Sequence, residues 1–156
     1  MDYGYGSYDA LSPLFSFGCV CFVFLAGLAV AIFILYQVFR CYEAIPVEHR
    51  LLEPWQVWLQ LIPLFGLVWQ FFVYPRLGRS FRSYFRSRGT EIGDGLEQLG
   101  IWASVVSCCV IIPCVGWLFG LAHLVLLIIF LVKALDLRRR VLEDVLVGPH
   151  APPVRF

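Results

Sequence analysis

Three long segments of the chain contain no Asp, Glu, Lys or Arg, and this absence constrains the fold more than any other feature. The segments are residues 10–39, 54–75 and 98–132. A helix needs roughly 20 mostly apolar residues to cross a bilayer, so each segment is long enough to do so. The chain is also 60% hydrophobic, with a mean hydropathy of +0.80, unlike a typical soluble domain. The sequence therefore predicts an all-α integral membrane protein.

The third segment is too long for a single crossing. Its 35 residues would form a helix of about 52 Å, whereas the hydrocarbon core is about 30 Å thick. The motif IIPCVGW provides a break, because Pro113 removes a backbone donor and Gly116 suits a tight turn. We therefore expect four transmembrane helices, the last two joined by a tight Pro/Gly hairpin.

The expected organisation is one integral membrane domain over residues 1–156. The predicted spans are about 14–38, 55–75, 95–112 and 117–137, with a short flexible arm at 1–12 and a tail at 141–156. The arm has no basic region and no cleavage site of small residues, so we expect the first helix to be retained.

The distribution of basic residues predicts an orientation. With four spans, the side that holds both termini and the second loop carries 10 Lys and Arg residues, and the other side carries 2. With three spans the best division is 7 against 5. Because basic residues collect on the cytoplasmic side, the count favours four spans with both termini in the cytoplasm.

Small residues four positions apart lie on one face of a helix and allow helices in lipid to approach closely. Three such pairs are present: Gly27 with Ala31, Gly100 with Ser104, and Gly116 with Gly120. Packing within the bundle is the first interpretation, and dimerisation is the second.

A basic stretch follows the second apolar segment. It contains Arg76, Arg79, Arg82, Arg86 and Arg88, mostly three or four positions apart and interleaved with apolar and aromatic residues. This pattern is typical of a cytosolic helical extension at an anionic membrane surface, so we expect the bilayer and its anionic headgroups as partners. Orientation alone also explains the arginines.

Four residues within the apolar segments are expected to form or free hydrogen-bonding groups inside the membrane. Pro63 frees a backbone carbonyl and is expected to kink the second span, and Gln60 and Gln70 are expected to form interhelical hydrogen bonds. His123 is the only ionisable side chain deep in an apolar segment. A structural hydrogen bond is its main interpretation, and a proton relay or haem ligand are alternatives.

The remaining candidates for chemistry are weaker. The six cysteines include no CxxC pair, so we expect packing roles, with a disulfide between Cys41 and Cys114 as an alternative. The first loop contains His49 and Glu53 among other possible metal ligands, and a solvated loop explains them equally well. The sequence contains no phosphate-binding loop, nucleophile elbow or HExxH motif, so we expect no catalytic residues, cofactor, metal or nucleic acid.

Residues 46–73 read PVEHRLLEPWQVWLQLIPLFGLVWQFFV. This stretch resembles a family of short, uncharacterised bacterial multi-pass inner-membrane proteins, which have a PxEHR turn followed by a VWLxLIPLFxLVWxFFV helix. The resemblance implies a location in the bacterial inner membrane and carries no known activity. In that family the position of Gly66 is often Asn, so any role of that amide is missing here.

These features lead to a functional expectation. We expect a non-enzymatic structural, accessory or signalling partner of a larger membrane assembly, or a homo-oligomer. A small transporter or channel lined by Gln60, Gln70 and His123 is the first alternative. A haem or redox membrane subunit that uses His123 is the second.

Overall fold

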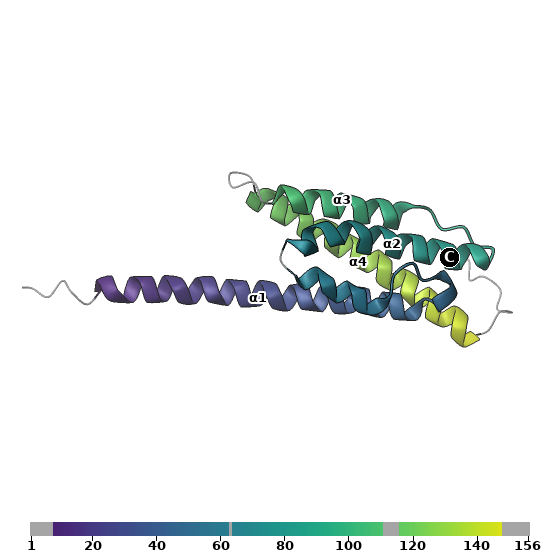
Figure 1. The fold of residues 1–156 in the computed structure, drawn as a ribbon, viewed down its shortest axis with the longest axis horizontal. Coiled ribbons are helices and arrows are strands. Elements are labelled where there is room, and N and C mark those ends of the chain that lie inside the picture. The colour runs from purple at the N-terminus through teal and green to yellow at the C-terminus, as the bar shows by residue number, and fades with distance from the viewer. Residues whose placement is uncertain (1–7, 63, 111–115, 148–156) are drawn as a thin grey trace, which may run out of the picture. The chain divides into compact units, whose positions relative to one another are not determined.

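The computed structural model describes residues 8–62, 64–110 and 116–147, and within these ranges all regular structure is helical (Figure 1). The elements in chain order are α1 (Tyr8–Ala44), the 3₁₀ helices η1 (Val47–His49) and η2 (Pro54–Leu61), α2 (Phe65–Ser87), α3 (Gly95–Cys109) and α4 (Gly116–Val147). The predicted all-α class is confirmed for these residues.

Two helical segments, Phe17–Ala44 and Leu118–Leu146, are long and apolar enough to cross a membrane. Only 6% and 17% of the residues in their most apolar windows are buried, whereas the core helix of a soluble domain would be mostly buried. This low burial favours contact with lipid. The structure does not establish four spans.

The contacts divide the chain into residues 1–34 and residues 35–156, and each part is described by itself. The first part contains most of α1, where the apolar side chains from Phe17 to Phe33 are largely exposed. An exposed apolar stretch of helix with no charged residue, here residues 17–33, is suited to a hydrocarbon environment.

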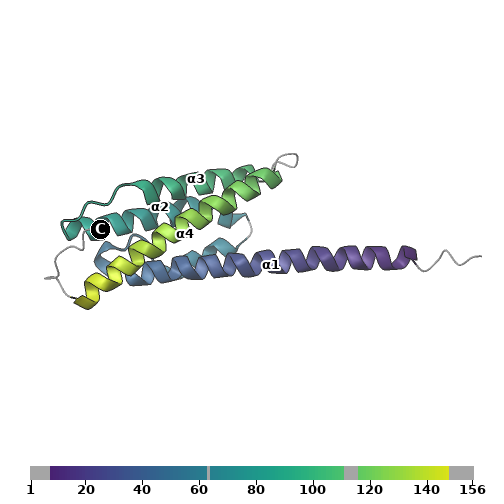
Figure 2. The same cartoon turned by 180° about the vertical axis from the view of Figure 1, so that it is seen from behind.

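The second part is built around α2, α3 and α4, which lie side by side (Figures 1 and 2). Its core includes the fully buried side chains of Val73, Leu77 and Phe81 from α2, Ala103 from α3 and Phe130 from α4. The last residues of α1 join this core, since Tyr42 is fully buried and its hydroxyl donates to the carbonyl of Val73 at 2.6 Å.

The expectation of one continuous second helix over 55–75 is wrong. Residues 54–61 form the 3₁₀ helix η2, and α2 begins only at Phe65. The residue before a proline avoids the α region, and Ile62 accordingly has ψ 117°. Leu64 then has φ 65°, in the left-handed region that reverses the chain. Pro63 itself lies outside the described residues, so its expected kink is not described.

η2 and the start of α2 pack against each other as a hairpin. Trp69 Nε1 donates to the carbonyl of Gln56 at 2.8 Å, and Gln60 Nε2 donates to the hydroxyl of Tyr74 at 2.7 Å. A Cβ at Gly66 would collide with the carbonyl oxygen of Gln60, so glycine permits this close approach.

Several helix ends differ from the expected boundaries, and α1, for example, ends at Ala44 and not near residue 38. α1 already begins at Tyr8, within the arm expected to be flexible, and α4 continues to Val147, within the expected tail. Ion pairs one turn apart support the extension of α4, with Arg139 to Glu143 at 2.8 Å and Arg140 to Asp136 at 2.9 Å. Most of the expected Pro/Gly hairpin, residues 111–115, lies outside the described residues.

Candidate functional site

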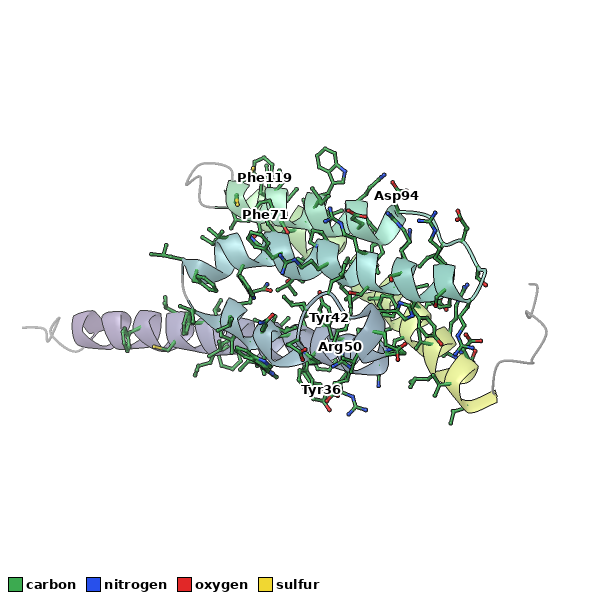
Figure 3. The ribbon with its side chains drawn as sticks, turned by 45° about the vertical axis from the view of Figure 1, so that its right-hand side comes forward. Tyr36, Tyr42, Arg50, Phe71, Asp94 and Phe119 are labelled. Carbon is green, nitrogen blue, oxygen red and sulfur yellow. The ribbon has the colours of Figure 1, made fainter. Side chains whose placement is uncertain are left out.

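The PVEHR turn closes the end of α1 against α2. Arg50 donates from its guanidinium to the carbonyls of Ile45 at 2.9 Å and Glu43 at 3.3 Å, which are carbonyls that the end of a helix leaves without partners (Figure 3). The backbone amide of Leu51 donates to the hydroxyl of Ser80 in α2 at 3.0 Å. We call residues 46–51 the latch, because they connect the last turn of α1 to α2.

His49 supplies the second connection of the latch. Its Nδ1 lies 3.0 Å from the hydroxyl of Ser83, and its Nε2 lies 3.1 Å from the hydroxyl of Ser87. The Ser87 hydroxyl donates to the carbonyl of Tyr84 at 2.7 Å, so it accepts from Nε2–H. This network assigns Nδ1 as the acceptor for the Ser83 hydroxyl.

The Ser83–His49 pair has the geometry of a nucleophile and its base. In a catalytic triad a carboxylate orients the histidine, whereas here the hydroxyl of Ser87 occupies that role. A hydroxyl supplies no negative charge to stabilise an imidazolium. The geometry therefore supports a structural connection between the latch and α2.

Tyr84 links α2 to the end of α4. Its hydroxyl donates to Oδ2 of Asp144 at 3.3 Å, and its ring lies edge-on to His49 with a centroid distance of 5.9 Å. The guanidinium of Arg88 lies 5.5 Å from the centroid of the Tyr84 ring and 3.9 Å from Asp144. Burial raises the pKa of the Tyr84 phenol, while the charge of Arg88 acts in the opposite direction.

We call the five arginines of the basic stretch after the second apolar segment the basic platform. Most of these arginines are paired with carboxylates. Arg79 and Arg82 both bind Glu97 of α3, at 2.6 and 3.1 Å. Arg86 lies 3.9 Å from Glu91, and Arg88 pairs with Asp144 as described above. The pairing brings α2, α3 and α4 together and lowers the positive charge offered to anionic headgroups.

Arg76 differs from the other four arginines of the platform. Its guanidinium lies 5.2 Å from the centroid of the Phe72 ring, one turn earlier on α2. This cation–π contact keeps the side chain along the helix near the end of the apolar segment. Among the described residues, no acidic side chain lies within salt-bridge distance of Arg76. Arg76 is thus the platform residue best placed to meet a phosphate headgroup.

The predicted polar positions are not brought together by hydrogen bonds. Gln60 binds Tyr74, whereas Gln70 is buried and donates to the carbonyl of Leu67 at 3.0 Å. His123 is half-buried, and its Nδ1 lies 2.9 Å from the carbonyl of Ala103 in α3. Each group has a different partner, and two of the three partners are backbone carbonyls, one in the same helix for Gln70 and one in the neighbouring helix for His123.

The small-residue pairs have three different environments. Gly100 and Ser104 are buried, and a Cβ at Gly100 would lie 2.8 Å from the Cβ of Tyr74. Gly116 lies against the carbonyl of Val110, whereas a Cβ at Gly120 would meet no atom within 4 Å. In the first part of the chain, a Cβ at Gly27 would meet no atom within 4 Å, and Ala31 is partly exposed.

Sequence reasoning did not identify Gly78, although the backbone of α3 lies close against α2 at this residue. A Cβ at Gly78 would lie 2.7 Å from the backbone nitrogen of Glu97. Gly78 sits four residues before Arg82, inside a stretch that was interpreted only by its charge. Its position one turn after Tyr74, which faces Gly100, is the signal that identifies a shared small-residue face.

The described residues contain no group of three His, Cys, Asp or Glu side chains that is arranged to hold a metal. Cys41 is buried, with Sγ 3.7 Å from the carbonyl of Ala134, and Cys114 lies outside the described ranges. Comparison with protein-family models, curated proteins and solved structures gave no match.

Proposed function

We propose that the chain is a non-enzymatic accessory protein of the bacterial inner membrane, and that it packs against another apolar helix through α1. The supporting observation is the face of α1 around Gly27 and Ala31, which is apolar and has space beside Gly27. Helices in lipid associate through small residues that let their backbones approach. This face is free to pack in that way on a partner helix or on a second copy of the chain.

The charged ends of α2, α3 and α4 complete the proposal. Ion pairs such as Arg79 with Glu97 and Arg88 with Asp144 fix these ends to one another at a polar surface. Anionic headgroups bind there through Arg76, whose charge is not neutralised by a nearby carboxylate. A rigid charged end and an open apolar helix face in one chain suit a subunit that presents a helix to an assembly.

The finer topology has two competing forms. Four crossings place both termini in the cytoplasm and residues 46–53 outside the cell. In the other form, residues 54–75 enter and leave the membrane on the same side. Both forms keep the apolar face of α1 in the bilayer, so the proposed function does not depend on the choice.

Crosslinking in native membranes, followed by purification in mild detergent and mass spectrometry, tests the proposed function. We expect a defined partner, or a homodimer, whose capture falls strongly in Gly27→Leu. Gly18→Leu is the matched control, because nine positions on a helix correspond to the opposite face and a Cβ at Gly18 also meets open space. A strictly monomeric protein with no crosslinked partner would contradict the proposal, as would equal loss in both variants.

A further inference from the structure

The latch and the C-terminal half of α2 are in direct contact. His49 lies within 3.1 Å of two hydroxyls of α2, those of Ser83 and Ser87, and the amide of Leu51 lies 3.0 Å from the hydroxyl of Ser80. These three contacts come from two different residues of the latch and extend over two turns of α2. They define a continuous surface of contact and not an isolated pair.

This contact determines on which side of a membrane the latch lies. A hydrocarbon core is about 30 Å thick, so groups about 3 Å apart are at the same membrane face. The four-span arrangement puts the latch outside the cell and Ser80–Ser87 in the cytoplasm. The hydrogen bonds of His49 and Leu51 cannot form in that arrangement.

The end of α4 lies at the same side of the membrane as the latch. Asp144 accepts from the Tyr84 hydroxyl at 3.3 Å and pairs with Arg88 at 3.9 Å. The start of α3 is also there, since Glu97 binds Arg79 and Arg82. The latch, the basic end of α2, the start of α3 and the end of α4 therefore share one side.

The segment between the latch and the basic end of α2 is apolar and folds back on itself. η2 leads away from the latch, the chain reverses between Leu61 and Phe65, and α2 returns. From Phe65 to Tyr74 the helix rises about 15 Å, which is about half of the hydrocarbon thickness. The reversal exposes Ile62, Leu64 and Phe65, and Leu64 is 80% exposed.

The two ends of the helical unit formed by residues 35–156 differ in polarity. Figure 3 shows Phe71 and Phe119 toward the end at which the hairpin reverses, and Asp94 toward the other end of α3. An apolar tip at one end and ion pairs at the other match the change from lipid interior to aqueous surface.

From these contacts we infer that residues 54–75 form a re-entrant hairpin, which enters the bilayer from the cytoplasmic side and returns to it. The hydrocarbon interior of the bilayer is the partner of the exposed tip at Ile62, Leu64 and Phe65. The inference rests on the proposed location in a membrane. With α1 as a crossing, and with α3 and α4 entering and leaving together, the chain before Phe17 lies on the outer side.

The basic residues support this topology independently. All 12 Lys and Arg residues of the chain follow Phe39. The re-entrant arrangement places all 12 on the cytoplasmic side and none outside, whereas four spans give 10 against 2. The removal of Arg40 and Arg50 from the outer side satisfies the positive-inside rule completely.

The backbone of the hairpin also fits a position inside the bilayer. Irregular backbone is tolerated there only where its polar groups find partners within the protein. The amide of Gly66 donates to the carbonyl of Ile62 at 2.8 Å, and the amide of Ile62 donates to the carbonyl of Leu59 at 3.2 Å. Trp69 satisfies the carbonyl of Gln56 from the returning helix. The reversal therefore carries its own hydrogen bonds into the apolar layer.

Thiol labelling of the full chain in intact bacterial cells tests the inference. Ser7→Cys, Glu48→Cys and Thr90→Cys each add one cysteine, and a membrane-impermeant maleimide reports the side on which it lies. The unmodified chain gives the background from its native cysteines. Glu48 and Thr90 are exposed, so these substitutions remove no buried contact.

We expect labelling of Ser7→Cys in intact cells, and labelling of Glu48→Cys and Thr90→Cys only after permeabilisation. Labelling of Glu48→Cys but not of Thr90→Cys from outside in intact cells would overturn the re-entrant hairpin and favour four spans. Labelling of Thr90→Cys from outside would overturn the orientation. Alkaline carbonate extraction of the same membranes distinguishes these results from failure of the proposed function, since release of the chain would refute membrane insertion itself.

Discussion

At the scale of single residues, glycine determines how closely α2 and α3 approach. A Cβ at Gly100 would lie 2.8 Å from Tyr74 Cβ and 2.9 Å from its carbonyl carbon, so Gly100→Ala forces the helices apart. We expect Gly100→Ala to lower the free energy of unfolding by about 1–3 kcal/mol, the usual cost of overpacking. Reversible unfolding in detergent measures the change.

Gly120→Ala is the matched control for this prediction. A Cβ at Gly120 meets no atom within 4 Å, and alanine is favoured over glycine in a helix by about 1 kcal/mol. We therefore expect Gly120→Ala to be neutral or stabilising. Equal effects of the two substitutions would show that the approach of α2 to α3 does not depend on Gly100.

Arg50 is the residue of the latch whose replacement should cost most. Its guanidinium binds two carbonyls at the end of α1, and hydrogen bonds to charged groups contribute about 1.5–3 kcal/mol. We expect Arg50→Ala to lower the free energy of unfolding by about that amount and to increase proteolysis near the end of α1. Arg40→Ala is the control, because its exposed pair with Glu43 at 3.8 Å should contribute under about 1 kcal/mol. An effect of Arg40→Ala as large as that of Arg50→Ala would refute the capping role.

At the scale of elements, the attachment of η2 to α2 depends on a polar contact inside an apolar layer. Gln60 donates to the hydroxyl of Tyr74 at 2.7 Å. A double-mutant cycle with Gln60→Leu and Tyr74→Phe should give a coupling energy of about 0.6 kcal/mol, and at most about 1.7 kcal/mol. The readout is again reversible unfolding in detergent.

A second cycle, with Gln56→Leu and Tyr74→Phe, provides the comparison. Gln56 engages Trp69 through its backbone carbonyl, which the substitution keeps. We expect a coupling energy near zero in this cycle. Comparable coupling in both cycles would mean that the hydroxyl of Tyr74 does not act through Gln60.

The sequence allowed the helical class and most element positions to be predicted, because long uncharged segments leave few alternatives to helices in lipid. α3 begins at Gly95, where it was expected. The second segment was misassigned because its length suffices for a span, and length does not reveal a reversal. Pro63 indicated a kink, but only the ψ of Ile62 and the positive φ of Leu64 show the break.

The latch could not have been predicted, since its partners are distant in the sequence. His49 and Ser87 are 38 positions apart, and neither residue type indicates the pairing. Glu97 likewise binds two arginines of α2, and this pairing joins two different helices. Spacing within one helix is readable from the sequence, whereas contacts between helices depend on how the chain reverses between them.

At the scale of the whole molecule, the two topologies respond differently to positive charge in the N-terminal arm. The re-entrant arrangement requires the arm to cross to the outer side, and added arginines oppose that transfer. We expect the combined substitutions Gly4→Arg, Gly6→Arg and Ser7→Arg to reduce correctly inserted chain severalfold, measured as carbonate-resistant, full-length protein. The corresponding substitutions to Glu are the control, because acidic residues contribute little to orientation. With four spans the arm stays in the cytoplasm, where arginines favour insertion, so an undiminished yield of the arginine variant would contradict the outer location of the arm. A loss equal to that of the Glu variant would instead show that the arm tolerates no substitution, and charge would then play no part in its placement.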